Sequence, residues 1–108
     1  MQKKTQNIQF LLSGDSLELK PIGEIDHHNA VMMRREADEL INTYKPKNVE
    51  LNLEKIDFMD SSGIGLIMGR YARMQKLGGE LILRDPGERV ERICRLAGLE
   101  RIVSIEKT

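Results

Sequence analysis

The segment Asp60-Ser61-Ser62-Gly63-Ile64-Gly65 contains the residues best suited to carry chemistry. It follows a predicted strand, and α/β proteins place their ligand and partner sites at the carboxyl ends of such strands. A serine hydroxyl at a helix start can cap the helix by accepting a backbone N–H bond. It can instead receive a phosphoryl group, whose charge is stabilised by the helix dipole and nearby N–H groups. Both interpretations apply to Ser61 and Ser62, and one serine can cap while the other is modified.

Two enzyme motifs with similar residues do not fit this segment. A dinucleotide-binding Gly-x-Gly-x-x-Gly pattern needs glycine where the chain has Met68, and no Gly-Lys-Ser/Thr of a P-loop follows. The Gly-x-Ser-x-Gly elbow of serine hydrolases needs a glycine two residues before the serine, where Met59 and Asp60 stand. The sequence therefore predicts no catalytic residue and no cofactor.

The glycines of this region leave two explanations open. Gly63 and Gly65 lack side chains, so another protein's backbone can come close and the loop can adopt unusual dihedral angles. The same residues could instead let the following helix pack close to the sheet. Gly65 and Gly69 allow the same two explanations further along that helix, whose exposed remainder is expected to include Arg70.

A second segment of interest is Gly23-Glu24-Ile25-Asp26-His27-His28. Asp26 is well placed to cap the next helix, with its carboxylate at the positive end of the helix dipole. The adjacent histidines point in different directions at a helix start, and no further ligands accompany them. No metal site is expected.

Composition excludes several functional classes. The 108 residues suffice for one domain, expected over residues 1–108 with a core at about 8–106. The 17 basic and 17 acidic residues balance, which argues against direct nucleic-acid binding. No apolar run approaches the roughly 20 residues that span a bilayer, and the start does not resemble a signal peptide, so we expect a cytoplasmic protein without membrane contact. The single cysteine, Cys94, is interpreted as a small core residue.

Hydrophobic periodicity predicts an α/β domain with a mixed sheet of four to five strands and helices mainly on one face. The expected elements are a hairpin over 8–21, a helix over 28–44, a strand over 49–53, a helix over 64–77, a strand over 80–84, a helix between 88 and 97, and a strand over 102–105. The inward stripe of the second helix is predicted to contain Ile64, Ile67, Met68, Tyr71, Met74 and Leu77, and that of the third Val90, Ile93, Cys94 and Ala97. The face of the 49–53 strand that bears Glu50 and Asn52 is expected to be partly wet. The stretch 23–28 remains unassigned.

These motifs resemble the STAS-domain anti-sigma factor antagonists, with the closest likeness to those that act on anti-sigma-F in spore-forming bacteria. The resemblance rests on Gly23 to His28, Leu51 to Glu54, Phe58 to Gly65 and Gly69 to Tyr71, and extends over essentially the whole chain. It implies that Ser61 is the phosphoacceptor. The partner-contact residues that it implies are Gly23, Asp26, His27, Asp60, Ser62, Gly63, Ile64, Gly65 and Arg70.

The resemblance also implies a partner-switching cycle. The unphosphorylated protein, monomeric when free, binds an anti-sigma factor that is also a serine kinase, and a sigma factor for sporulation transcription is released. The kinase holds the nucleotide and phosphorylates Ser61, and a serine phosphatase reverses this. The alternative is a structural or regulatory STAS subunit of another signalling or transport assembly, and the serine pair favours the switch.

Overall fold

Hydrophobic residues alternate between strand and helix spacing along the chain, and the elements follow this alternation. The computed structural model describes residues 2–108, so Met1 of the expected domain 1–108 lies outside the described residues. The strands are β1 (Gln2–Lys4), β2 (Ile8–Ser13), β3 (Ser16–Pro21), β4 (Gly23–Ile25), β5 (Asn48–Asn52), β6 (Ile56–Met59), β7 (Glu80–Arg84) and β8 (Ser104–Glu106). The helices are α1 (His27–Tyr44), α2 (Ser61–Lys76), α3 (Glu88–Leu96) and a short 3-10 turn, η1 (Leu99–Arg101).

The main sheet is mixed, as predicted, with the order β1-β2-β3-β5-β7-β8. The predicted hairpin is confirmed, since β2 and β3 pair antiparallel from Ile8 opposite Pro21 to Ser13 opposite Ser16. The strands β3, β5, β7 and β8 run parallel. The sheet has six strands rather than four or five in the described chain, because β1 also pairs with β2 although its residues, Gln-Lys-Lys, carry no hydrophobic alternation.

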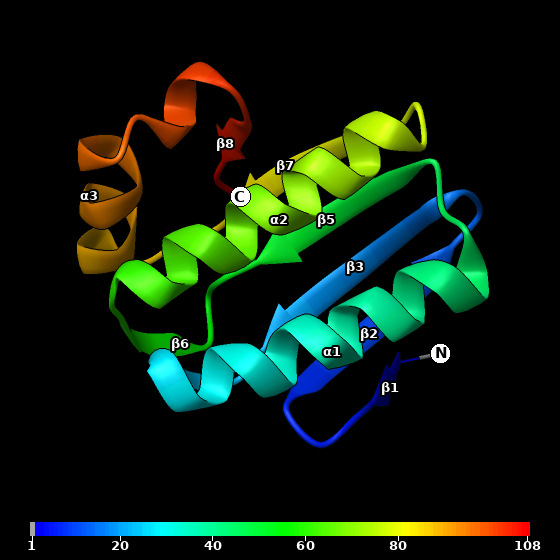
Figure 1. Cartoon of the computed structure of the whole chain (residues 1–108), viewed down its shortest axis with the longest axis horizontal. Helices are drawn as coiled ribbons and strands as arrows, with labels where there is room; N and C mark the ends of the chain where they lie inside the picture. Colours follow the sequence, from blue (N-terminus) through cyan, green and yellow to red (C-terminus); the bar gives the residue numbers. More distant parts are fainter. Residues whose placement is uncertain (1) are drawn as a thin grey trace.

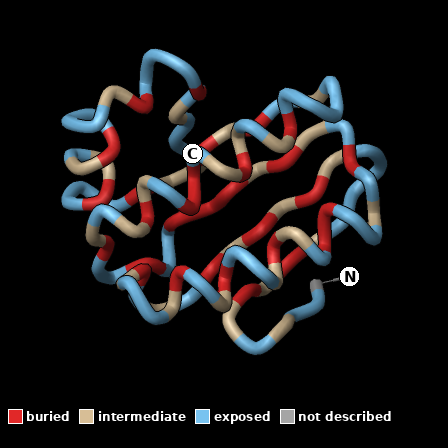
Figure 2. The backbone as a smooth tube through the Cα atoms, viewed as in Figure 1, coloured by how far each residue is buried: buried red, intermediate tan, exposed pale blue. Residues whose placement is uncertain are grey.

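The predicted placement of helices on one face is confirmed: α1 and α2 lie side by side across the same face of the sheet (Figure 1). The third helix lies at one end, next to β6. Buried residues follow the central strands and the inner sides of the helices (Figure 2). Cys94 is fully buried among them, as predicted, and burial raises the pKa of its thiol to about 11.

Polar pairs across strands occupy the other face of the sheet. Arg84 of β7 lies between Glu50 of β5 and Glu106 of β8, and its Nε donates to Glu50 over 2.8 Å. This hydrogen bond raises the pKa of Arg84. The prediction of a partly wet face is correct for Glu50 but wrong for Asn52, which is buried because its side-chain oxygen accepts the backbone N–H of Glu54.

The inward face of α2 differs from the predicted stripe. Ile67 and Met74 are buried as expected, but Met68 and Leu77 are 43% and 55% exposed. The buried line instead includes Leu66 and Arg70. Successive helix residues point about 100° apart, so a buried face that includes Leu66 and Ile67 directs Met68 toward solvent. In α3, Ala97 is also exposed rather than inward, because it is the C-cap residue.

The expectation that Arg70 lies on an exposed helix face is wrong. Arg70 is only 6% exposed, and its Nε lies 3.1 Å from Asp38 Oδ1 on α1. The two atoms form an ion pair by distance but are not aligned as a hydrogen bond, and Arg70 Nη1 has no partner within residues 2–108. Burial lowers the pKa of Arg70, and Asp38 opposes this effect. The pair therefore joins the two helices at a cost in desolvation.

Gly63 is the point of closest contact between α2 and β6. A Cβ at this position would collide with Cγ and Sδ of Met59 and come within 3.3 Å of Ile25 Cγ2. At Gly65 and Gly69 an added Cβ meets nothing within 4 Å. The close-packing explanation is therefore correct for Gly63 and wrong for Gly65 and Gly69.

We expect Asp38→Ala to lower the free energy of unfolding by about 3 kcal/mol, because it leaves the buried Arg70 charge without its partner. Adding Arg70→Met to Asp38→Ala should recover most of this loss, since a neutral side chain of similar length then fills the site. Urea denaturation of the two single variants and the double variant measures the coupling. Losses that simply add would show that the pair contributes no coupling.

Gly63→Ala should lower stability by about 1–3 kcal/mol, because the methyl group overpacks against the buried Met59 side chain. Gly65→Ala is the matched control on the same helix. Its added methyl group enters open space and removes a helix-destabilising glycine, so stability should rise by about 0.5–1 kcal/mol. Thermal unfolding of both variants checks the contrast, and equal shifts in Tm would contradict it.

Candidate functional site

A second, two-stranded sheet brings the two sequence motifs together. Strand β4 pairs parallel with β6, with Ile25 opposite Met59. The backbone N–H of Asp60 then donates to the carbonyl of Ile25 over 3.1 Å. Because both strands run in the same direction and end together, the residues that follow them start α1 and α2 at the same end of the molecule (Figure 1). The segments 23–28 and 60–65 therefore form one surface.

Gly23 supports this arrangement through its backbone. Its φ is +101°, a conformation that residues with a side chain rarely adopt, and the strand register shifts between Gly23 and Glu24. The N–H of Gly23 donates to the carbonyl of Lys55 over 3.0 Å. The glycine thus has a conformational role, and its expected partner contact stays a prediction.

Aspartates cap both helices. The predicted cap by Asp26 is confirmed, since its Oδ1 accepts the N–H of Asn29 over 2.8 Å. Asp60 caps α2 in the same way, with its Oδ1 accepting the N–H of Ser62 over 2.7 Å. The interpretation of Ser61 or Ser62 as the N-cap is therefore wrong. The longer aspartate, one residue earlier, takes this role and leaves both hydroxyl groups for other use.

The two serines differ in their surroundings. Ser61 is the first residue of α2 and is exposed, whereas Ser62 is half-buried. Neither hydroxyl makes a hydrogen bond within residues 2–108. A nucleophile must reach its co-substrate, so a phosphoryl donor carried by another protein can approach Ser61 more directly. Exposure therefore distinguishes two residues that the sequence leaves equivalent.

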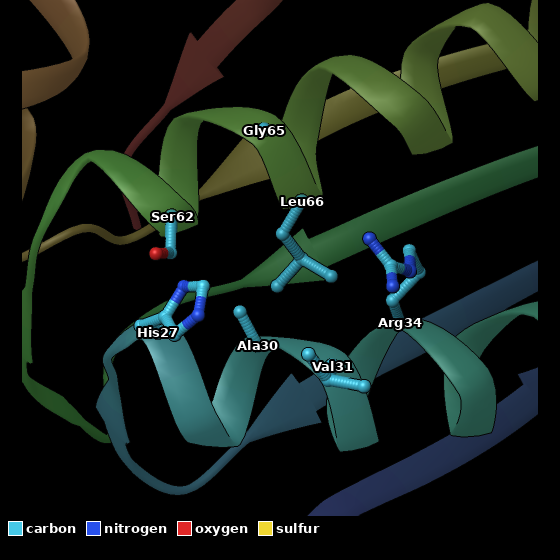
Figure 3. Close-up of a pocket in the computed structure, with 7 residues that line it drawn as sticks. All are labelled: His27, Ala30, Val31, Arg34, Ser62, Gly65 and Leu66. Carbon is cyan, nitrogen blue, oxygen red and sulfur yellow. The ribbon is translucent and has the colours of Figure 1, made fainter.

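Ser62 instead points into a groove between α1 and α2 (Figure 3). The groove has a volume of about 250 Å³. The Ser62 hydroxyl and the His27 ring lie toward each other across the gap between the helices (Figure 3). The groove is lined by His27, Ala30, Val31, Arg34, Ser62, Gly65 and Leu66.

The predicted contact residues fall into three groups. Exposed at the surface are His27 and Gly65, and half-buried beside them are Gly23, Asp26, Asp60, Ser62 and Ile64. Gly63 and Arg70 are buried, so neither presents a side chain to a partner.

Sequence reasoning missed three residues near this surface. Arg34 and Val31 line the groove. In the sequence nothing distinguished them from the other residues of the predicted helix over 28–44. Phe58 is 49% exposed on β6, two residues before Asp60. An exposed aromatic residue beside a functional loop is typical of a protein contact, but no sequence signal distinguished it from a core residue.

The site offers hydroxyl, carboxylate and cationic groups. No three metal-ligating side chains gather within residues 2–108. The same part of the chain has no helix both long and apolar enough to cross a membrane. The chemistry that these residues can provide is that of a modifiable binding surface.

Comparison with known proteins agrees with this architecture. The STAS domain family matches residues 5–108. The chain is 40% identical over 83 residues to the anti-sigma F factor antagonist of Paenibacillus polymyxa, covering 77% of this chain and 71% of that protein.

Two solved structures are similar over most of the chain. The anti-sigma factor antagonist SpoIIAA in its unphosphorylated form is 27% identical, with a TM-score of 0.78 over 91% of this chain and 86% of that one. The Bacillus cell fate determinant SpoIIAA in its phosphorylated form is 26% identical, with a TM-score of 0.70 over 91% and 89% of the two chains. The sequence match and the shared fold confirm the resemblance: the chain belongs to the STAS domain family, among its anti-sigma factor antagonists.

Proposed function

We propose that this chain binds an anti-sigma factor that is also a serine kinase, through the surface formed by the segments 23–28 and 60–65, and that phosphorylation of Ser61 ends the binding. The main support for this proposal is that Ser61 is exposed at the start of α2, while Asp60 rather than a serine caps the helix. The similar SpoIIAA is known in unphosphorylated and phosphorylated forms, which supports a switch of this kind.

Binding of the anti-sigma factor would release a sigma factor for transcription, and the relatives that act on anti-sigma F make sporulation genes the proposed target. A serine phosphatase would return the protein to its binding form. The nucleotide belongs to the kinase in this scheme. The chain itself is proposed to act in the cytoplasm as a binding protein, monomeric when free, rather than as an enzyme.

Electrostatics gives the reason for the off state. A phosphate adds about 1.5 to 2 negative charges. On Ser61 these charges would lie beside the half-buried carboxylate of Asp60 in a surface that loses water when a partner docks. Like charges placed together in a desolvated interface weaken binding strongly. Phosphorylation therefore acts locally and needs no rearrangement of the fold.

Incubation with the cognate anti-sigma kinase and ATP should add one phosphate to the peptide containing Ser61 and Ser62, on Ser61. Mass spectrometry of that peptide locates the group. Ser62→Ala should still accept one phosphate on Ser61, whereas Ser61→Ala should accept none. Phosphate on Ser62, or none with an active kinase, would contradict the assignment, and the latter result would favour the structural-subunit alternative.

Ser61→Ala should bind the anti-sigma factor with wild-type affinity, and Ser61→Asp should bind at least about tenfold more weakly, because a permanent charge lies in the contact surface. Isothermal titration calorimetry measures both. Arg35→Glu is the control, because it changes the charge at an exposed position elsewhere on α1. Equal affinities for Ser61→Ala and Ser61→Asp would rule out a charge-based switch.

A further inference from the structure

The groove between α1 and α2 has an excess of positive charge. Arg34 and His27 line it, and no acidic residue does. Neither Arg34 nor His27 forms an ion pair within residues 2–108. The carboxylate of Asp38, four residues after Arg34 on α1, is paired with Arg70.

Two further arginines, Arg70 and Arg73, interact electrostatically near the groove. Burial lowers the pKa of Arg70, the Asp38 carboxylate opposes this, and the guanidinium groups of Arg34 and Arg73 lower the pKa further. The guanidinium groups of Arg34 and Arg73 thus act on that of Arg70, and of the three only Arg34 lines the groove. Arg70 Nη1 and Arg73 Nε are buried without hydrogen-bond partners in the described chain. An incoming anion would reduce this repulsion.

The rest of the lining is apolar. Ala30, Val31 and Leu66 form the walls, and Val31 is 40% exposed. Gly65, with no side chain and nothing within 4 Å of an added Cβ, leaves the rim open to another backbone. A group that suits this groove has a short apolar stem and a charged, planar head.

We propose that the groove is a subsite for an acidic side chain of the anti-sigma partner, with the carboxylate held by Arg34 and its methylene groups against Val31 and Leu66. This inference rests on the proposed function and adds which chemical group of the partner is recognised. The guanidinium fork of Arg34 matches a carboxylate in two-point geometry. Ser62 supplies a hydroxyl on the opposite wall, which gives the second serine a binding role distinct from that of Ser61.

An amino-acid carboxylate fits better than a free phosphate. Phosphate has no apolar part, so it would leave the walls formed by Ala30, Val31 and Leu66 without a partner. The groove also adjoins the surface proposed to bind the partner, because Ser62 and Gly65 belong to both. A partner segment that contacts the start of α2 can therefore place a side chain between the helices.

The test is calorimetric titration of the full chain with the purified anti-sigma factor, comparing wild type, Arg34→Glu and Arg35→Glu. The two variants carry the same charge change on neighbouring, exposed residues of α1, but only Arg34 lines the groove. Arg34→Glu should weaken binding at least about tenfold, and Arg35→Glu by less than about threefold. Circular dichroism melting checks that both variants fold.

Charge exchange identifies the partner group. Single Asp→Lys and Glu→Lys substitutions on the anti-sigma factor are titrated against Arg34→Glu, and one of them should restore most of the lost affinity. Equal weakening by Arg34→Glu and Arg35→Glu, or no restoring substitution, would overturn the subsite while wild-type binding keeps the proposed function intact. Absence of wild-type binding would overturn both. Competition by inorganic phosphate that Arg34→Glu abolishes would assign the groove to phosphate and overturn the carboxylate assignment.

Discussion

The parallel pairing of β4 with β6 is the constraint on which the functional surface depends. These strands are three and four residues long, yet their register sets Ile25 opposite Met59, and Asp60 donates back to Ile25. Both chain segments then leave the small sheet at the same level, and each begins a helix with an aspartate cap. The pairing brings together two motifs that are far apart in sequence, since Asp26 and Asp60 are 34 positions apart. Local capping and long-range pairing together make one site.

The interface between α1 and α2 combines tight packing with unbalanced charge. Near the start of α2, Gly63 packs closely against Met59 of β6, and an added Cβ there would collide with the Met59 side chain. Further along, Asp38 and Arg70 join the helices through a buried ion pair that leaves polar atoms unsatisfied. A buried pair of this kind is weak evidence for stability, because desolvation offsets much of the attraction. Here it joins the two helices across their interface, beyond the groove that Ser62 lines.

The site shows how one short segment can hold separate tasks. Asp60 caps the helix, Ser61 faces solvent, Ser62 faces the groove, and Gly63 is buried. Successive residues of a helix point about 100° apart, so four neighbours reach four environments. A charge added at the exposed position changes the surface while the capping bond and the buried contact stay as they are. The phosphorylation proposed for Ser61 would therefore have little cost in folding stability.

Residue type and spacing were enough to predict the hairpin, the three helices, the parallel strands around β5 and β7, the Asp26 cap and the family, because these depend on local periodicity, capping chemistry and an uninterrupted motif. Sequence could not reveal β4 and β6, since two very short strands are stable only through each other. It could not rank Ser61 against Ser62, place Arg70 inside, or find the groove around Arg34. Those features depend on how α2 is rotated against α1 and the sheet, and only tertiary packing sets that rotation.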